Sequence, residues 1–338
     1  MAERPTDNAP LITVLMPVYN AAPFVAAAIT SILEQTFTDF ELIIVNDGST
    51  DGSSAVISAF LDPRIRTITQ VNQGISAALN TGLALARGEF IARQDADDLS
   101  LPERLEKQVA YLRAHPDVGL LGTWATIIDK EGVQLDTLEH ATDDDGIRFA
   151  LLFDTPFVHA SAMFRKSLIN EIGGYDPDTA IFEDHNLWSR MIQSTRGANI
   201  PEHLMKYRLV DSGLMQSTTQ RIERIRTQRL RNLSMAFPNA SVELLNDLSE
   251  FTLRHARITT SRFRAVFSAL SEHVARTCRD PLAAKHLHDR VRNGMLGYHI
   301  IARPTHIHAA VDRLLKEILL LSSAGLRDAT NSRKAHVR

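Results

Sequence analysis

Cysteine is almost absent from the 338-residue sequence, which contains only Cys278. One cysteine excludes an internal disulfide and a cysteine-rich metal site, and it is typical of a reducing compartment. The sequence also lacks any apolar run near the roughly 18 residues that a membrane-spanning helix needs, so we expect no membrane span. Its first ten residues, MAERPTDNAP, lack the apolar core of a signal peptide. These absences predict a cytoplasmic protein with a disordered N-terminal tail.

Several nucleotide-binding and catalytic motifs are also missing. No GxGxxG follows the first apolar segment, and no GxxxxGK followed by Ser or Thr occurs, so neither a dinucleotide-binding fold nor a P-loop is indicated. The first apolar segment carries neither an aspartate nucleophile of the DxDx type nor a glycine-rich loop with Lys or Arg, which argues against a phosphatase and a nucleotidyltransferase. The arginine-rich C-terminal part has no known recognition motif, so we expect no nucleic-acid partner.

Charge divides the sequence into two parts of opposite sign. The formal net charge is −3, but residues 1–214 sum to about −14 and residues 215–338 to about +11. An acidic unit can hold a cation and a basic unit can face an anionic surface, although the two units could also dock on each other. The predicted boundaries are 1–10 and 331–338 for disordered tails, 11–214 for an α/β domain, and 215–330 for a smaller α-helical domain.

Four apolar segments predict buried strands, each followed by a polar loop. The predicted strands cover residues 11–18, 40–45, 66–69 and 90–92, and the predicted helices between them cover 23–34, about 51–61 and 75–86. This alternation predicts an α/β fold with a doubly wound, mostly parallel, Rossmann-like sheet. The loops after the first, second and fourth strands should converge at the carboxyl edge of the sheet, where ligands bind in such folds.

Three carboxylates, Asp95, Asp97 and Asp98, follow the fourth predicted strand within four positions. Two carboxylates about 4 Å apart repel by roughly 1 kcal/mol in water and about 4 kcal/mol at a half-buried site. A hard divalent cation such as Mg²⁺ or Mn²⁺, shared with substrate phosphates, would relieve this repulsion. A solvated acidic loop is the alternative. Ser100 with Glu103 is typical of a capping box that opens the next helix.

The rest of the sequence predicts further strands and helices. Residues 118–128 and 157–164 are expected to form strands, the second carrying His159, and Asp143, Asp144 and Asp145 are expected to be solvated. Helical periodicity extends over residues 220–237, 243–270 and 305–321. The apolar stripes of these helices could form a core, dock on an anionic membrane surface, or build a homodimer.

Four motifs in order carry a resemblance to a known family: VLMPVYN, ELIIVNDGSTDGS, NQGISAALNTGLALARGEFIARQDADD and FEDHNLWSRM. Over about residues 11–210 the sequence resembles the family 2 glycosyltransferases of the GT-A fold. The resemblance implies transfer of a sugar from a nucleotide diphosphate sugar to an acceptor hydroxyl, with inversion at the anomeric carbon. No Q/RxxRW signature of processive enzymes is present, so we expect the addition of one sugar.

The resemblance implies a donor site built by loops after the strands. Tyr19 would lie against the base, and Asp47 would accept a hydrogen bond from it, since a carboxylate can accept from the N3–H of uracil or thymine. Packing for Tyr19 and a turn or capping role for Asp47 are the alternatives. The other residues assigned to the nucleotide sugar are Pro17, Asn20, Asn72, Gly74, Arg93, Asp95 and Ala96.

Asp95 and Asp97 match the DxD motif of the family. The resemblance implies that Asp97 binds Mn²⁺ or Mg²⁺ directly, and that Asp95 holds the ribose or the water shell of the metal. The cation would stabilise negative charge on the leaving diphosphate. Asp98 would contact the metal-binding residues rather than the metal, or would cap a helix, and Arg93 could reduce the repulsion among the acids.

The FEDHNLW motif supplies the acceptor side. An inverting displacement needs a carboxylate that removes the acceptor proton, and we assign this base to Asp184, with Glu183 orienting the acceptor or the base. Both acids could instead merely occupy a helix N-terminus. His159 and Trp188 are assigned to the acceptor side, with burial in the core as the alternative for each.

One position departs from the family pattern. Where many relatives have a His two residues after Tyr-Arg, this sequence has Val210, which leaves the metal more dependent on Asp97. We expect a role in building a cell-surface polysaccharide or glycolipid, on a glycan or lipid-linked acceptor. The expected location is the cytoplasm, with peripheral contact at the inner face of the membrane as an alternative. The alternatives are a metal-dependent nucleotidyltransferase or phosphatase, and a nucleotide-sugar-binding protein without activity.

Overall fold

The computed structural model describes residues 9–179, 182–210, 218–250 and 260–277. The chain divides into two compact units, Met1–Gln228 and Arg229–Arg338, and each is described here by itself. The helix predicted over residues 305–321 and the tail predicted over 331–338 lie outside the described residues.

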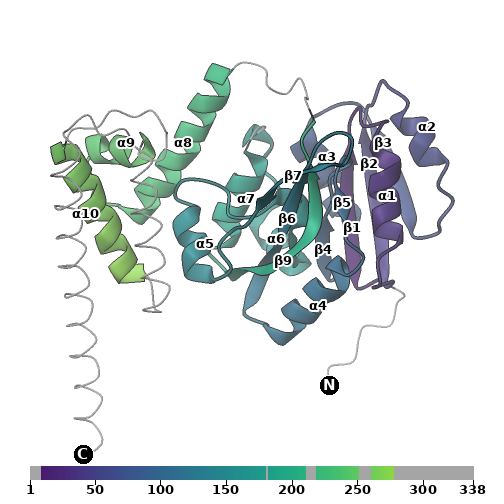
Figure 1. Ribbon diagram of the computed structural model, residues 1–338, viewed down its shortest axis with the longest axis horizontal. Helices are drawn as coiled ribbons and strands as arrows, with labels where there is room; N and C mark the ends of the chain where they lie inside the picture. Colours follow the sequence, from purple (N-terminus) through teal and green to yellow (C-terminus); the bar gives the residue numbers. More distant parts are fainter. Residues whose placement is uncertain (1–8, 180–181, 211–217, 251–259, 278–338) are drawn as a thin grey trace, which may run out of the picture. The chain divides into compact units, whose positions relative to one another are not determined.

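The first part of the chain forms the predicted parallel sheet (Figure 1). It comprises strands β1 (Ile12–Val18), β2 (Phe40–Asp47), β3 (Ile65–Gln70) and β4 (Phe90–Arg93), which lie in the order β3-β2-β1-β4. Every residue of β1, β2 and β4 is buried, as expected for continuous apolar runs in the centre of a sheet that is covered on both faces. The carboxyl ends of these strands therefore lie along one edge, as predicted.

Helices cover the two faces of the sheet. On one face, apolar residues of α1 (Val25–Leu33), α2 (Ser53–Ser58) and α4 (Arg104–Ala114) join the core. On the other face, the core includes residues of four further helices. These helices are α3 (Ile75–Leu85), α5 (Asp144–Ala150), α6 (Lys166–Ile172) and α7 (Glu183–Met191). The architecture is the three-layer α/β arrangement that the sequence predicts.

The sheet continues beyond β4 with mixed direction and reaches nine strands. Strand β8 (Met163–Arg165) pairs antiparallel with both β4 and β6 (Val118–Ile128), and β9 (Arg196–Arg208) runs parallel to β6. The short β5 (Leu99–Ser100) adds to β9, and β7 (Gln134–Leu138) forms a hairpin with β6. β4 therefore lies where the parallel part of the sheet meets the part of mixed direction.

Gly88 lies at the turn between α3 and β4, where the chain passes very close to β1. A Cβ atom at this position would collide with the backbone N of Thr13 and would lie 2.6 Å from the carbonyl carbon of Ile12. The Gly88 N–H donates to Oγ1 of Thr13 at 2.9 Å. Only glycine allows this approach, which sets the start of β4.

Two predictions about local structure are wrong. The strand expected over residues 157–164 is reduced to β8, because Ser161 N–H donates to the Val158 carbonyl and closes a 3₁₀ turn, η1 (His159–Ser161). Ser100 does not open a helix: it lies in β5, and its hydroxyl donates to Gln94 Oε1 at 2.7 Å. Among the described residues, no side chain caps α4, which begins at Arg104.

The prediction that Asp143 to Asp145 are solvated is wrong for Asp144, whose side chain is 12% exposed, whereas Asp143 is exposed as predicted. The Asp143 carboxylate caps α5 by accepting from Gly146 N–H at 2.8 Å. The Asp144 carboxylate accepts from Gly197 N–H at 2.9 Å and from Arg148 Nε at 2.8 Å. Asp143 thus stabilises the start of α5, and Asp144 joins α5 to the start of β9.

The C-terminal unit is helical in its described part, in agreement with the predicted periodicity. Helices α8 (Thr218–Ala236), α9 (Val242–Glu250) and α10 (Thr260–Thr277) occupy it, with α8 beginning in the first unit. Of the helical segment predicted over residues 243–270, the described residues belong to α9 and α10. Their buried apolar residues are Leu233, Phe237, Leu248, Val266, Leu270 and Val274. None of the helices in the described ranges is both long enough and apolar enough to cross a membrane.

Candidate active site

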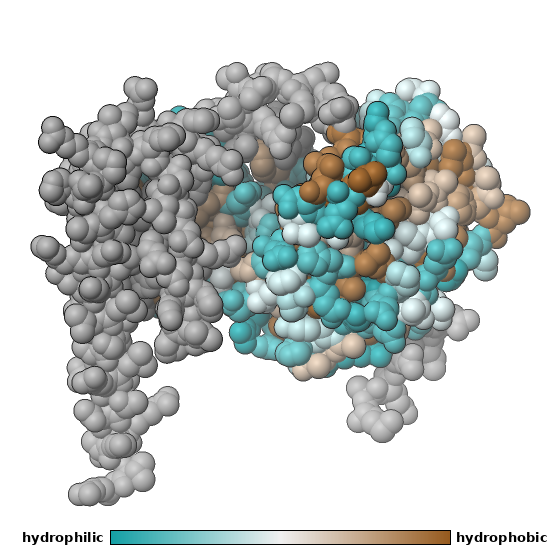
Figure 2. Space-filling view, viewed as in Figure 1, coloured by the Kyte–Doolittle hydropathy of each residue, from teal (hydrophilic) through white to brown (hydrophobic). Residues whose placement is uncertain are grey.

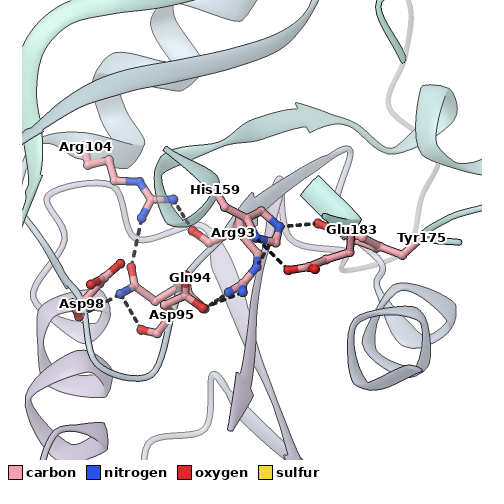
Figure 3. A network of polar contacts seen from close by, with 8 residues as sticks. All are labelled: Arg93, Gln94, Asp95, Asp98, Arg104, His159, Tyr175 and Glu183. Atoms are coloured by element: carbon pink, nitrogen blue, oxygen red, sulfur yellow. Dashed lines mark hydrogen bonds and ion pairs between the residues drawn. The ribbon is translucent and has the colours of Figure 1, made fainter. Parts of the chain in front are cut away.

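The loop after β4 is organised by the buried side chain of Arg93, which is 1% exposed. Figure 3 shows its guanidinium lying between Asp95 on one side and His159 on the other. Nη2 of Arg93 pairs with Asp95 Oδ1 at 2.6 Å, and Nη1 donates to the Gln94 carbonyl. Burial lowers the pKa of Arg93, but Asp95 and other acidic groups outweigh this effect and raise it. The Arg93 side chain therefore stays charged and holds Asp95 in place. A charged Arg93 beside Asp95 is what the predicted role of Arg93, reducing the repulsion among the three carboxylates, requires.

The negative charges of Asp97 and Asp98 are less well neutralised by their neighbours than that of Asp95. Burial, with the charge of Asp95, raises the pKa of Asp97 to about 6 and that of Asp98 well above its ordinary value. Oδ1 of Asp98 accepts from the Arg208 N–H at 2.7 Å, while Oδ2 is buried with no hydrogen-bond partner among the described residues. The loop thus contains more desolvated negative charge than its own contacts neutralise.

This carboxylate loop fits a hard divalent cation in its chemistry. No cluster of three or more His, Cys, Asp or Glu side chains is placed to hold a metal within the described part of the chain. A site with one or two carboxylates is nevertheless what Mg²⁺ uses when substrate phosphates and water complete its shell. Asp95 and Asp97 provide such oxygen atoms at partly exposed positions, and Ala96 between them is buried.

The loops after β1 and β2 are joined by Asn20, which adopts a left-handed conformation with φ 51°. Its Oδ1 accepts from Thr50 N–H at 2.8 Å, and its own N–H donates to Ser49 Oγ at 3.1 Å. The preceding residue, Tyr19, is 53% exposed, so its ring is accessible to a ligand. Pro17 is buried inside β1 and shapes the strand end.

Asp47 is buried at the end of β2, and its carboxylate holds the loop that follows β3. Oδ1 accepts from Gln70 Nε2 at 2.7 Å and from Gln73 N–H at 3.0 Å, and Oδ2 accepts from Gly74 N–H at 2.8 Å. Gly74 has φ 87°, and Asn72 is exposed beside it. The geometry thus gives Asp47 a structural task, while acceptance from a nucleotide base stays a prediction.

His159, Tyr175 and Glu183 form the opposite side of the site (Figure 3). Nε2 of His159 lies 3.3 Å from Arg93 Nε and 2.9 Å from the Tyr175 hydroxyl oxygen, and Nδ1 lies 3.9 Å from Glu183 Oε1. Trp188 is 0% exposed and packs edge-on against His159 and Phe157. Burial in the core, the alternative to an acceptor-binding role, accounts for all of these contacts of Trp188.

Glu183 and Asp184 form the first turn of α7, whose N-cap is Phe182, so neither acid occupies the cap position. Burial, with the neighbouring Asp184, raises the pKa of Glu183 to about 7. Burial also raises the pKa of Asp184 to about 6, against the opposing effect of the His185 N–H that donates to it at 2.6 Å. Two desolvated carboxylates with raised pKa values are typical of a functional site.

The sequence interpretation missed three residues that hold this site together. Arg104 is buried and donates to the Arg93 carbonyl at 2.5 Å and to Gln94 Oε1 at 3.0 Å, and its burial lowers its pKa to about 9. Arg208 donates to the Asp97 carbonyl at 2.8 Å. The Tyr175 hydroxyl lies 2.9 Å from Nε2 of His159. Two of these residues stand beside motifs that the sequence interpretation did use. Arg208 is the Arg of the Tyr-Arg pair that precedes Val210, and Tyr175 directly follows the Gly173-Gly174 pair.

The sequence matches the family described as "Glycosyl transferase family 2" over residues 13–173. It is 37% identical over 209 residues to the putative glycosyltransferase EpsE of Bacillus subtilis, covering 60% of this chain and 74% of EpsE. It is 33% identical over 213 residues to the O-antigen biosynthesis glycosyltransferase WbnJ of Escherichia coli, covering 61% of this chain and 83% of WbnJ.

The fold is similar to that of the mannosyltransferase PcManGT from Pyrobaculum calidifontis, solved with GDP-Man and Mn²⁺. The TM-score is 0.53 at 20% identity, and the match covers 96% of this chain and 88% of that chain. Fold and relatives together define a glycosyltransferase of the GT-A type and do not favour a nucleotidyltransferase or a phosphatase. The chain belongs to glycosyl transferase family 2.

Proposed function

We propose that the protein transfers one sugar from a nucleotide diphosphate sugar to an acceptor hydroxyl, with inversion at the anomeric carbon. The observation that carries the proposal is the placement of two pairs of acids around the buried guanidinium of Arg93. Asp95 and Asp97 follow β4, and Glu183 and Asp184 open α7. Arg93 interacts electrostatically with Asp95 and with Glu183. One pair is suited to the leaving diphosphate and the other to the attacking hydroxyl.

On the donor side, we assign the metal-binding role to Asp97, with Asp95 at the ribose or the metal's water shell. When bound, Mn²⁺ or Mg²⁺ would neutralise charge that grows on the departing diphosphate. The exposed ring of Tyr19 is available to stack on the base, and the backbone at Asn72 and Gly74 can approach the nucleotide closely. The solved PcManGT structure, which holds GDP-Man and Mn²⁺, supports this assignment.

On the acceptor side, we assign the general base to Asp184. Its carboxylate takes the proton of the acceptor hydroxyl as the hydroxyl oxygen bonds to the anomeric carbon and the bond to the diphosphate breaks. A base is most effective when its pKa lies close to the working pH, and the pKa of about 6 meets this condition. Glu183 orients the acceptor or the base.

The pathway proposed is the assembly of a cell-surface polysaccharide or glycolipid. The name of WbnJ, an O-antigen biosynthesis glycosyltransferase, supports this. A glycan or a lipid-linked glycan would serve as acceptor. Exposed large hydrophobic side chains after β3 and β9 and in the β6–β7 hairpin favour an acceptor with an apolar part. They are Val71, Leu209, Val133 and Leu135, and Figure 2 shows apolar patches on an otherwise mainly hydrophilic face.

We assign the transferase domain to residues 11–214 and a second, helical domain to residues 215–330. The excess of basic residues in the second domain supports peripheral contact with an anionic membrane at its cytoplasmic face, with a homodimer as the alternative. Flotation of the full chain with vesicles containing anionic lipid, at low and high salt, tests the membrane contact. Salt-sensitive flotation is expected, and a salt-independent dimer without flotation would refute it.

The decisive experiment on the function compares Asp184→Asn with the wild type and with Glu171→Gln, a control at an exposed acid on α6. Purified protein is first screened with UDP, GDP and dTDP sugars to find the donor. Asp184→Asn should lower kcat by about 10² to 10⁴-fold, the usual contribution of a general base, and should keep donor affinity. Turnover like that of the wild type would remove Asp184 as the base.

A further inference from the structure

The protonation state of His159 is determined by the groups around its Nε2 atom. Arg93 Nε lies 3.3 Å from this atom, and a guanidinium carries only N–H donors and no acceptor. Nε2 must therefore accept the hydrogen bond and cannot carry a proton. Burial and the charge of Arg93 lower the pKa of His159 well below its ordinary value, so the ring is neutral. Its single proton must then be on Nδ1.

Tyr175 strengthens this arrangement at the same ring nitrogen. Its hydroxyl oxygen lies 2.9 Å from the same Nε2 atom. Burial raises the pKa of the Tyr175 phenol, which therefore stays protonated and can donate. The rings of Tyr175 and Trp188 lie 5.8 Å and 5.7 Å from the His159 ring, measured between centroids, and restrict its rotation. Two donors from separate elements thus converge on one ring nitrogen.

The Nδ1–H of His159 faces Glu183. Nδ1 and Glu183 Oε1 lie 3.9 Å apart, and both side chains are only 12% exposed. A hydrogen bond to oxygen requires about 2.7–3.2 Å, so a movement of roughly 1 Å by the Glu183 side chain would form it. The charged and polar groups that face the imidazole are Arg93 from β4, Tyr175 from the turn after α6, and Glu183 from α7.

We propose that His159 is a positioning residue, fixed as its Nδ1–H tautomer by Arg93 and Tyr175, that holds the Glu183 carboxylate in place for the acceptor. This inference rests on the proposed transferase function, because it gives the acceptor-side acid its orientation. Through Arg93, which also holds Asp95, the same contacts fix the distance between the donor loop and the acceptor helix. His159 itself does not touch the reacting atoms.

The tautomer can be observed directly, without any activity. In the full chain labelled with ¹⁵N-histidine, long-range ¹H–¹⁵N correlation spectra distinguish a protonated from an unprotonated ring nitrogen. The chain has 13 histidines, so the signal of His159 is assigned by its loss in His159→Asn. We expect the neutral Nδ1–H pattern, unchanged from pH 6 to pH 8, and retained in Tyr175→Phe because Arg93 still donates to Nε2. An Nε2–H pattern, or a ring that becomes charged in this range, would overturn the proposal.

Two substitutions then separate the two sides of the ring. The amide of Asn lies near the position of Nδ1 and can donate to Glu183, whereas the amide of Gln reaches the position of Nε2 and can only accept from Arg93. We expect His159→Gln to lose about 100-fold in kcat with donor affinity within about twofold of the wild type. His159→Asn should keep kcat within about tenfold and bind donor more weakly, because Arg93 loses its acceptor.

Equal losses of kcat in the two variants would refute a positioning role. If either variant fails to fold, Tyr175→Phe provides the test. This variant keeps the contact between Arg93 and His159, so its kcat should stay within about fivefold of the wild type. A larger loss of kcat would count against Arg93 as the residue that sets the tautomer. If the wild type transfers no sugar from any donor, the proposed function fails, while the spectra still decide the tautomer independently.

Discussion

Replacing Arg208 with methionine should destabilise the first unit strongly. The guanidinium donates to three backbone carbonyls, those of Asp97 at 2.8 Å, Asp129 at 2.9 Å and Lys130 at 3.0 Å, and it lies 5.0 Å from the centre of the Phe24 ring. Each hydrogen bond to a charged group contributes about 1.5–3 kcal/mol. Because such contributions are not additive, we expect a loss of about 3–5 kcal/mol in the free energy of unfolding, which is a large part of an ordinary domain's stability.

Urea unfolding followed by tryptophan fluorescence is the appropriate assay, because both tryptophans of the chain, Trp124 and Trp188, lie in the first unit. Lys206→Met is the matched control, since Lys206 lies on the same strand two residues earlier and has no ion pair with another described residue. Arg208→Lys should fall between the two, because one ammonium group cannot reach all three carbonyls. An Arg208→Met protein within about 1 kcal/mol of Lys206→Met would show that this anchoring contributes little.

Four further predictions concern the site and the sheet. Log kcat/KM should fall by about one unit per pH unit below pH 6, because Asp184, whose pKa is raised to about 6, must be ionised to act as a base; a flat profile from pH 5 to 7 contradicts this. The raised pKa values of Asp184, about 6, and Glu183, about 7, mean that the folded state binds more protons than the unfolded state between about pH 4 and pH 7. Urea titrations of the metal-free protein should therefore show a free energy of unfolding that falls as pH rises through this range. Mn²⁺ should strengthen binding of a nucleoside diphosphate in calorimetry, and Asp97→Ala should remove that gain; an equal gain in both proteins would exclude Asp97 as the ligand. Gly88→Ala should lower the free energy of unfolding by more than about 3 kcal/mol, because the added Cβ meets the backbone of β1. Gly52→Ala is the control: its Cβ would lie 3.7 Å from its nearest neighbour, so the free energy of unfolding should change by less than about 1 kcal/mol.

The parallel half of the sheet could be predicted because each strand is a local signal. A continuous apolar run such as residues 40–45 can be buried on both faces only in the centre of a covered sheet, so its pattern alone indicates its environment. The 3₁₀ turn at His159 and the short strand β5 had no such signal. β5 exists because Leu99 and Ser100 pair with Lys206 and Met205, about a hundred positions later in the sequence.

The acidic residues of the candidate site could be predicted from the sequence, but the contacts between the site residues could not. The carboxylates at Asp95, Asp97 and Asp184 follow from motif and element boundaries. The contact of Arg93 with His159 joins residues 66 positions apart, and its geometry depends on β8 being antiparallel to β4. A sequence gives the types of these side chains, whereas the tautomer of the imidazole depends on which donor faces which nitrogen.

The position of β4 between the two halves of the sheet has a consequence for the order in which the site matures during synthesis. The four parallel strands are complete by Arg93, so a growing chain has them before the rest of the sheet emerges. Arg208 donates its N–H to Asp98 and its Nε–H to the Asp97 carbonyl across 110 and 111 positions. A nascent chain that stops before residue 196 would thus contain the four parallel strands β1 to β4 and still leave the acidic loop unanchored, so the loop reaches its final geometry only after β9 has joined the sheet.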